Sequence, residues 1–274
     1  MIPYVSDAWS ALNSNFWTSL FGAGFGAIAG AWAAQRIADQ KELRRNQIQE
    51  IRSTNTAITI AVAASNLFAA LKRQYVRPLK ESFDAARKEL QNFEKIEGVE
   101  RGAQPLVFRF KADFQEIMAT RSQTDALKNI LFYKINSRSK HLTLMHLLIQ
   151  VEDNLNSCIE KRNQFIEEIR TSKIDDQRKL VDLYFGRIDK DGHIDERYPA
   201  LIEGISTFTD DALVFSISLA RDLVEHGSEL EAALGRHGPR VTRPDFKKIE
   251  ELDLIPKTDD YRELLARISG DAER

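Results

Sequence analysis

The sequence predicts an all-α protein: one N-terminal transmembrane helix continues into a long cytoplasmic helix, and a helical-bundle domain follows. Three observations predict it. Residues 8–35 carry no charge, helical spacing of apolar residues recurs later in the 274-residue chain, and long Gly/Ser linkers and repeats are absent. Charged residues make up 29% and nearly balance, so net charge indicates no particular partner. We expect residues 1–14 outside the cytoplasm, 15–35 in the membrane and 36–274 in one cytoplasmic domain.

The predicted span is the run FWTSLFGAGFGAIAGAWAA, residues 16–34. A helix of that length measures about 28 Å, close to the hydrocarbon thickness of a bilayer. Trp17 and Trp32 stand near its two ends, where indole rings favour the membrane interface. A signal peptide would need basic residues before the apolar run, and none precedes Arg36. A buried core helix is the remaining alternative, although each glycine in the run would destabilise it by about 1 kcal/mol relative to alanine.

The flanking charges predict the orientation of this span. No Lys or Arg precedes it, whereas a cluster of basic residues follows: Arg36, Lys41, Arg44, Arg45 and Arg52. The positive-inside rule therefore places the N-terminus outside and the rest of the chain in the cytoplasm. The single cysteine, Cys158, excludes an internal disulfide and suits a reducing compartment. Together with Trp17 and Trp32, Arg36 is expected to anchor the helix at the interface.

Small residues recur every four positions within the span. One face carries Gly22, Gly26 and Gly30, and a neighbouring face carries Ser19, Ala23 and Ala27. Small residues let helices approach closely in lipid, so two such faces favour a homo-oligomer, with a tetramer as one candidate size. In a ring of spans, the glycines would form the helix contacts and Ser19, Ala23 and Ala27 would face a pore. A simple anchor with small residues by chance is the alternative.

Beyond the span, one helix is expected from 36 to about 77, because Pro78 is the first helix breaker. Residues 57–71 are apolar enough to suggest a second span, but their short length favours a buried helix. LVFRF, residues 106–110, alternates apolar and basic side chains and is expected to contribute one short strand pair. The remaining predicted helices cover 79–96, 124–136, 140–171, 175–186, 199–235 and 258–269.

One pattern suggests catalysis. Arg221 and His226 form an R-x4-H pattern that resembles the catalytic motif of HEPN ribonucleases. The pattern is short, and roughly one such match is expected by chance in this composition. A solvated arginine near a helix-end histidine explains it equally well. The histidines and the cysteine form no compact ligand cluster in the sequence, so we expect neither a metal nor a cofactor. Catalysis is therefore the alternative to a non-enzymatic function.

A local basic patch follows Asp125. No acidic residue occurs from there to Glu152, while cations and an aromatic ring accumulate: Lys128, Tyr133, Lys134, Arg138 and Lys140. Such a patch can hold an anionic ligand, for example single-stranded nucleic acid or a nucleotide. Pairing of these cations with acidic helices, or contact with lipid headgroups, is the alternative.

The N-terminal third resembles known membrane proteins through three stretches. They are GAGFGAIAGAWAAQRIA, KELRRNQIQEIRSTNTA and KRQYVRPLKESFD, within roughly the first 85 residues. This layout resembles the single-span effectors of bacterial anti-phage defence operons, including the channel effector of Hailong-type systems. The resemblance implies a homo-oligomeric channel in the bacterial inner membrane. A nucleic-acid ligand made by a partner nucleotidyltransferase would hold it shut, and release of that ligand would depolarise the membrane.

These observations predict a homo-oligomeric membrane effector that forms a pore or ion channel and is gated through its cytoplasmic domain. Two alternatives remain. A membrane-anchored HEPN-like ribonuclease would use Arg221 and His226, and a non-catalytic scaffold would use the span only as a tether.

Overall fold

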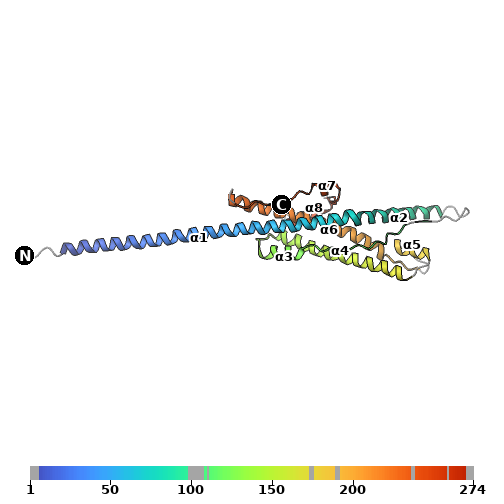
Figure 1. Ribbon diagram of the computed structural model, residues 1–274, viewed down its shortest axis with the longest axis horizontal. Helices are drawn as coiled ribbons and strands as arrows, with labels where there is room; N and C mark the ends of the chain where they lie inside the picture. Colours follow the sequence, from blue (N-terminus) through green and yellow to red (C-terminus); the bar gives the residue numbers. More distant parts are fainter. Residues whose placement is uncertain are drawn as a thin grey trace, which may run out of the picture.

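The computed structural model describes the backbone of residues 6–97, 108–109, 111–172, 176–188, 192–235, 238–257 and 259–269. Side chains are described from Gly30 onward within these ranges, except at 96–97, 260 and 269. The described elements are helical, as predicted, and among them the only β-pairing is an isolated bridge between Ile188 and Ile194. Figure 1 shows a long rod, α1 (Ser6–Leu71), which projects from a bundle that its C-terminal part joins.

Helix α1 is a single unbroken α-helix. No proline occurs between Pro3 and Pro78, so nothing in this stretch removes a backbone donor from the helix. Every side chain from Gly30 to Asn46 is exposed, and we call this segment, residues 30–46, the stalk. The helix expected to leave the predicted span and enter the following domain therefore does so without interruption.

Beyond the stalk, α1 packs against α6 (Arg197–Leu234), which in turn packs against α4 (Ser139–Thr171). The side chains that α1 buries recur every three or four residues: Ile51, Thr54, Ala57, Ile58, Ala61, Ala64, Ser65 and Phe68. Ser65 Oγ also lies 3.0 Å from Ser216 Oγ of α6, so the polar atoms in this seam are paired. Residues 57–71, considered above as a second span, thus form the core side of α1.

One helix meets the length and composition expected of a membrane span where side chains are described. It runs from Gly30 to Lys95, and 56% of its apolar window is buried inside the protein, as in a core helix. The predicted span at 15–35 lies mostly before Gly30. Its backbone is helical, but its side chains are outside the described part of the chain.

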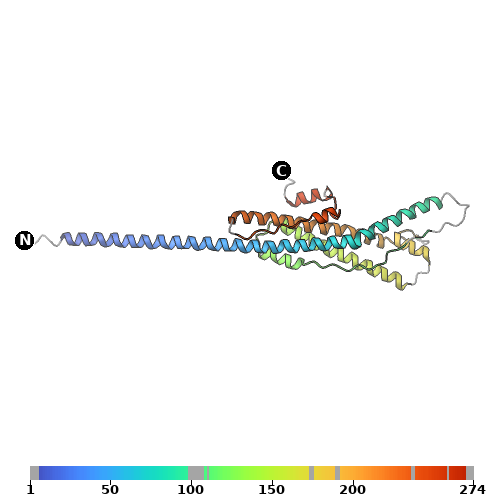
Figure 2. The same ribbon diagram turned by 45° about the horizontal axis from the view of Figure 1, so that its top comes forward.

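A π-helix, Lys72–Val76, joins α1 to α2 (Arg77–Glu97). The Arg77 backbone N–H donates to the carbonyl of Lys72, five residues earlier, and Pro78 has no N–H to donate. The helix therefore continues through the proline with altered hydrogen bonding, where the sequence predicted a break. Figure 2 shows α2 diverging from the axis of α1 at this joint.

Residues 111–122 run without regular secondary structure along α4, and we call them the strap. Asn163 bonds both the N–H and the carbonyl of Ile117, at 3.2 and 2.8 Å, and Asn156 does the same to Thr120, at 2.9 and 2.7 Å. The short strand expected at 106–110 is not seen: Phe108 and Arg109 are not in a strand, and 106, 107 and 110 lie outside the described residues. In the strap, side chains of α4 thus bond backbone groups of Ile117 and Thr120 that a neighbouring strand would pair in a sheet.

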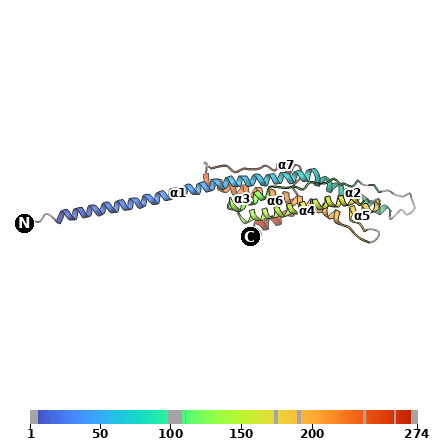
Figure 3. The same ribbon diagram turned by 60° about the horizontal axis from the view of Figure 1, so that its bottom comes forward.

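The other helices are α3 (Thr124–Tyr133), α5 (Gln177–Phe185), α7 (Lys247–Glu251) and α8 (Asp259–Ser269). All but α7 match predicted helices. After α6 the chain returns along α1, as Figure 3 shows, and Asn55 of α1 bonds the carbonyl of Arg240 and the N–H of Thr242. A Cβ on Gly227 of α6 would lie 2.9 Å from Val241, so glycine permits this close approach.

Candidate functional site

Three buried ionisable side chains and one half-buried carboxylate gather where α1 enters the bundle. Glu50 comes from α1, His141 from α4, and Asp222 and His226 from α6; we call these four residues the buried cluster. His141 is 0% exposed, Asp222 4% and His226 6%. Burial of such groups costs free energy unless they are paired, so their partners determine what the cluster can do.

His141 contacts Asp222 inside this cluster. Its Nε2 lies 2.9 Å from Asp222 Oδ2, at ion-pair distance but with an angle outside good hydrogen-bond geometry, and Lys140 Nζ lies 2.7 Å from Oδ1. The Arg138 backbone N–H donates to His141 Nδ1 at 3.1 Å, so Nε2 carries the ring proton. Burial acts to raise the pKa of Asp222, but His141 and Lys140 outweigh it, and the pKa lies below its ordinary value. Asp222 is therefore a buried anion that pairs with Lys140 and lies against His141.

Glu50 links α1 to two other parts of the bundle. Its Oε1 lies 3.2 Å from His226 Nε2 and accepts the Asn136 backbone N–H at 2.8 Å. Burial and the neighbouring His141 lower the pKa of His226, although Glu50 acts in the opposite direction. His226 is therefore neutral at pH 7. The two histidine rings lie edge to face, with centroids 5.3 Å apart.

A polar cavity of about 530 Å³ opens beside Glu50. We call it the root groove; its lining residues are Asn46, Gln49, Glu50, Ser53, Phe132, Tyr133, Lys134, Ile135 and Asn136. One wall is the last turn of the stalk and the first buried turn of α1. The other wall is the end of α3 and the loop that precedes α4, so the groove touches both the rod and the bundle.

The structure divides the predicted anionic-ligand residues among different environments. Tyr133 and Lys134 line the root groove. Arg138 pairs with Glu229 and Lys140 with Asp222, which is the pairing with acidic helices that the sequence left open. Lys128 is exposed on α3 and does not line the groove. Neighbouring carboxylates therefore pair with two of the four cations in the predicted patch.

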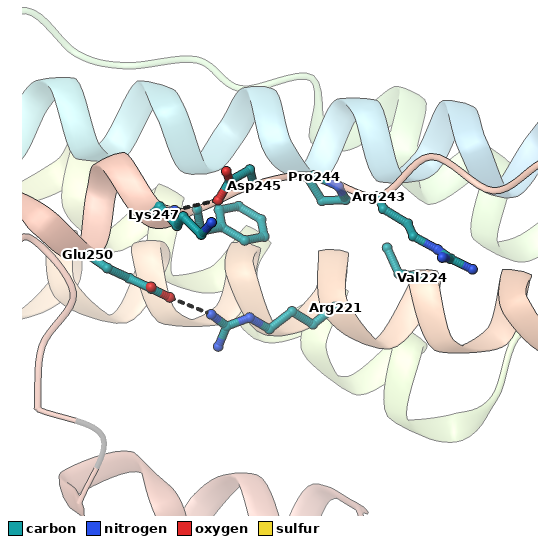
Figure 4. Close-up of a pocket in the computed structure, with 8 residues that line it drawn as sticks. Arg221, Val224, Arg243, Pro244, Asp245, Lys247 and Glu250 are labelled. Atoms are coloured by element: carbon teal, nitrogen blue, oxygen red, sulfur yellow. Dashed lines mark hydrogen bonds and ion pairs between the residues drawn. The ribbon is translucent and has the colours of Figure 1, made fainter.

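Arg221 and His226 are not brought together. Arg221 lines a separate cavity of about 340 Å³, where its Nη2 lies 2.9 Å from Glu250 Oε1 and its guanidinium lies 5.6 Å from the centre of the Phe246 ring. Figure 4 shows Arg221 extending toward Glu250 while Arg243 points the other way. The Arg221 side chain is 58% exposed, whereas that of His226 is 8% exposed and contacts Glu50.

The structure describes the side chains of only some of the predicted membrane residues, those from Gly30 onward. The side chains of Ser19, Ala23, Ala27 and Trp17, and the surroundings of Gly22 and Gly26, lie outside the described part. A Cβ on Gly30 would meet no atom within 4 Å of it. Trp32 is 63% exposed, and the Arg36 guanidinium lies 5.4 Å from the centre of its ring. This end of the stalk is therefore exposed.

Glu50 and Asp222 were not predicted as site residues from the sequence, and neither was the contact of His141 with Asp222. Where side chains are described, no three His, Cys, Asp or Glu residues converge as they would around a metal. The sequence does contain a signal for Asp222. It lies three residues after Leu219 and four before His226, which places it on the buried face of α6. That spacing marks a charged residue that needs an internal partner.

Comparisons of the chain with protein-family models, with curated proteins and with solved structures find no match.

Proposed function

We propose that this protein is a homo-oligomeric membrane effector that forms a pore or ion channel and serves in bacterial anti-phage defence. In this proposal the N-terminal helices line the pore, and a ligand or partner acting on the bundle gates it. The observation that supports it best is the continuity of α1. One helix carries the predicted span at 15–35, the exposed stalk and a core seam of the bundle.

A continuous helix can transmit movement from the bundle to the predicted span, whereas a helix that only attaches the protein to a membrane does not need to. An α-helix is stiff over its length, so a rotation or tilt of the buried part of α1 would reach the span about 25 Å away along the stalk. A protein that only needed attachment to a membrane would be served by a flexible linker. The stalk, which is exposed on all sides and contains no Pro, favours a mechanical connection.

The partners follow from the same proposal. Membrane lipid and further copies of the chain would cover the predicted span, with Gly22, Gly26 and Gly30 at helix contacts. A single-stranded nucleic acid or nucleotide signal, and a nucleotidyltransferase that makes it, are implied only by the resemblance of the N-terminal third. Placement in the bacterial inner membrane, with the N-terminus outside, rests on the charges that flank the span.

The ribonuclease and scaffold alternatives differ from the pore in observable ways. Because Arg221 pairs with Glu250 on the surface and His226 is buried against Glu50, the two side chains form no common site in this conformation. A ribonuclease would need them to move together, and His226→Ala would then abolish RNA cleavage. A scaffold would leave both RNA and membrane potential unchanged.

The pore is tested by expressing the chain in bacterial cells and recording membrane potential with a voltage-sensitive dye. We expect the wild-type chain to depolarise the membrane and Gly26→Leu to abolish this, because leucine separates helices at a small-residue contact. Ile28→Leu is the matched control, since it places leucine on the opposite side of the same helix and should depolarise normally. A wild-type chain that is present in the membrane fraction but leaves the potential unchanged contradicts the pore.

A further inference from the structure

The root groove contains one carboxylate and one ammonium group, so its lining has no excess of positive charge. Of the residues that line it, Glu50 is acidic and Lys134 is basic, while Asn46, Gln49 and Ser53 are neutral. The contacts of Glu50 with His226 and with the Asn136 N–H both fall on Oε1. Its side chain is 20% exposed, so the second oxygen is placed to accept from a ligand in the groove. The cations that would have attracted an anion here, Arg138 and Lys140, are paired elsewhere.

Two aromatic rings stand beside this carboxylate. Phe132 is 50% exposed and Tyr133 83% exposed, and their ring centres lie 6.3 Å apart at 46°. Burial normally removes such side chains from water, so two adjacent exposed rings at a cavity mark a contact surface. Ammonium and guanidinium groups bind the faces of aromatic rings and donate hydrogen bonds to carboxylates. The groove combines both features within about 530 Å³.

We propose that the root groove binds a cationic ligand bearing an ammonium or guanidinium group, with Glu50 accepting from the cation and Phe132 and Tyr133 covering it. Lys134 acts against such a ligand, because its ammonium lines the same cavity. A polyamine or an exposed Lys or Arg of a peptide carries the required chemistry. Binding itself does not depend on whether the span forms a pore.

Occupancy of this site would act on α1. Glu50 is one helical position before Ile51, which is 0% exposed and begins the core seam, and it connects α1 to α6 through His226 and to the loop before α4 through Asn136. A cation that draws the carboxylate toward the groove weakens both contacts at the point where the rod enters the bundle. This regulatory step, unlike binding, rests on the proposed function.

The test is a titration of the full-length chain, in nanodiscs and at constant ionic strength, with spermidine and with arginine amide by calorimetry. We expect Glu50→Gln to weaken binding about tenfold, since it removes a charge-assisted hydrogen bond but keeps the shape and the Oε1 acceptor. Lys134→Ala should strengthen binding about twofold by removing a competing charge. Glu42→Gln on the exposed stalk is the control and should bind as wild type does.

The opposite pattern would mean an anion site. If Lys134→Ala weakens and Glu50→Gln strengthens binding of an oligothymidylate probe, and neither cation binds at about 1 mM, the proposal is wrong. Should Glu50→Gln unfold, Tyr133→Leu provides the second test, because its ring is exposed and its loss should still weaken cation binding severalfold. A chain that binds spermidine yet never depolarises membranes would contradict the pore and leave this site intact.

Discussion

His226 is the residue whose protonation the fold disfavours most clearly. Its pKa lies below the ordinary value of 6.5, first because it is buried and then because His141 is near, despite Glu50. The unfolded chain therefore binds more protons than the folded chain just below pH 6.5. Asp222, whose pKa is also lowered, follows the same rule but at far lower pH, below its ordinary 3.8. His226 and Asp222 therefore affect the free energy of unfolding in different pH ranges, so their contributions can be measured separately.

We expect the contribution of His226 to be complete above about pH 6.5 and to decline as the pH falls toward its folded-state pKa. The free energy of unfolding should decrease in that window by at most about 1.4 kcal/mol per pH unit. Urea unfolding of the full-length chain between about pH 7.5 and pH 5 measures it. His226→Gln, which cannot take a proton, should flatten the slope; an unchanged slope would show that another group is responsible.

Single residues were the hardest features to predict from sequence. Arg138 and Lys140 belong to an acid-free stretch that the sequence left open as a ligand patch or as cations paired with acidic helices, and carboxylates on α6 pair with both. Their partners, Glu229 and Asp222, lie more than 80 residues away in the chain, so only the packing of α4 on α6 reveals the pairing. Charge in a sequence shows where a cation lies but not what faces it.

At the scale of elements, helical periodicity predicted α3, α4, α5, α6 and α8 closely. It predicted them because each buries one face, and that requirement is visible in the spacing of apolar residues. The strap was not predicted. Side chains of α4 form hydrogen bonds with its backbone groups. Such contacts require no regular spacing of apolar residues, so the sequence of the strap carries no pattern from which they could be predicted. The strand expected at 106–110, just before the strap, is not seen where the structure describes it, at Phe108 and Arg109.

The hydrogen bonds between α4 and the strap should contribute measurably to the free energy of unfolding. Asn163→Ala removes an acceptor from the Ile117 N–H and a donor to its carbonyl, and Ile117 is 4% exposed. Because buried backbone groups are left unpaired, we expect a loss of about 2–3 kcal/mol in the free energy of unfolding. Asn154→Ala, at an exposed position of α4, should change it by less than about 0.5 kcal/mol. Urea unfolding measures both, and faster hydrogen exchange at the Ile117 amide would locate the effect; equal losses would contradict it.

At the scale of the whole molecule, the rod and the bundle are one continuous object. Helix α1 extends well beyond the bundle (Figure 1), and the residues that line the root groove lie where α1 enters the bundle. A ligand at the groove would thus act at the base of a lever whose other end is the predicted span. If α1 transmits movement from the groove to the span, the stiffness of α1 must affect gating. The stalk is a suitable place to test this because its side chains are exposed.

Ala38→Pro tests the stiffness of the stalk. Proline in a helix interior removes one backbone hydrogen bond and kinks the helix, at a cost of about 3 kcal/mol, while the bundle has no buried contact to lose here. We expect the variant to reach the membrane and to unfold in urea like wild type, but to lose depolarisation in the dye assay. Ala38→Gln, a helix-compatible change at the same exposed site, should depolarise normally. Normal depolarisation by Ala38→Pro would show that the span works independently of the bundle, because a kinked rod cannot transmit a rotation that a straight one does.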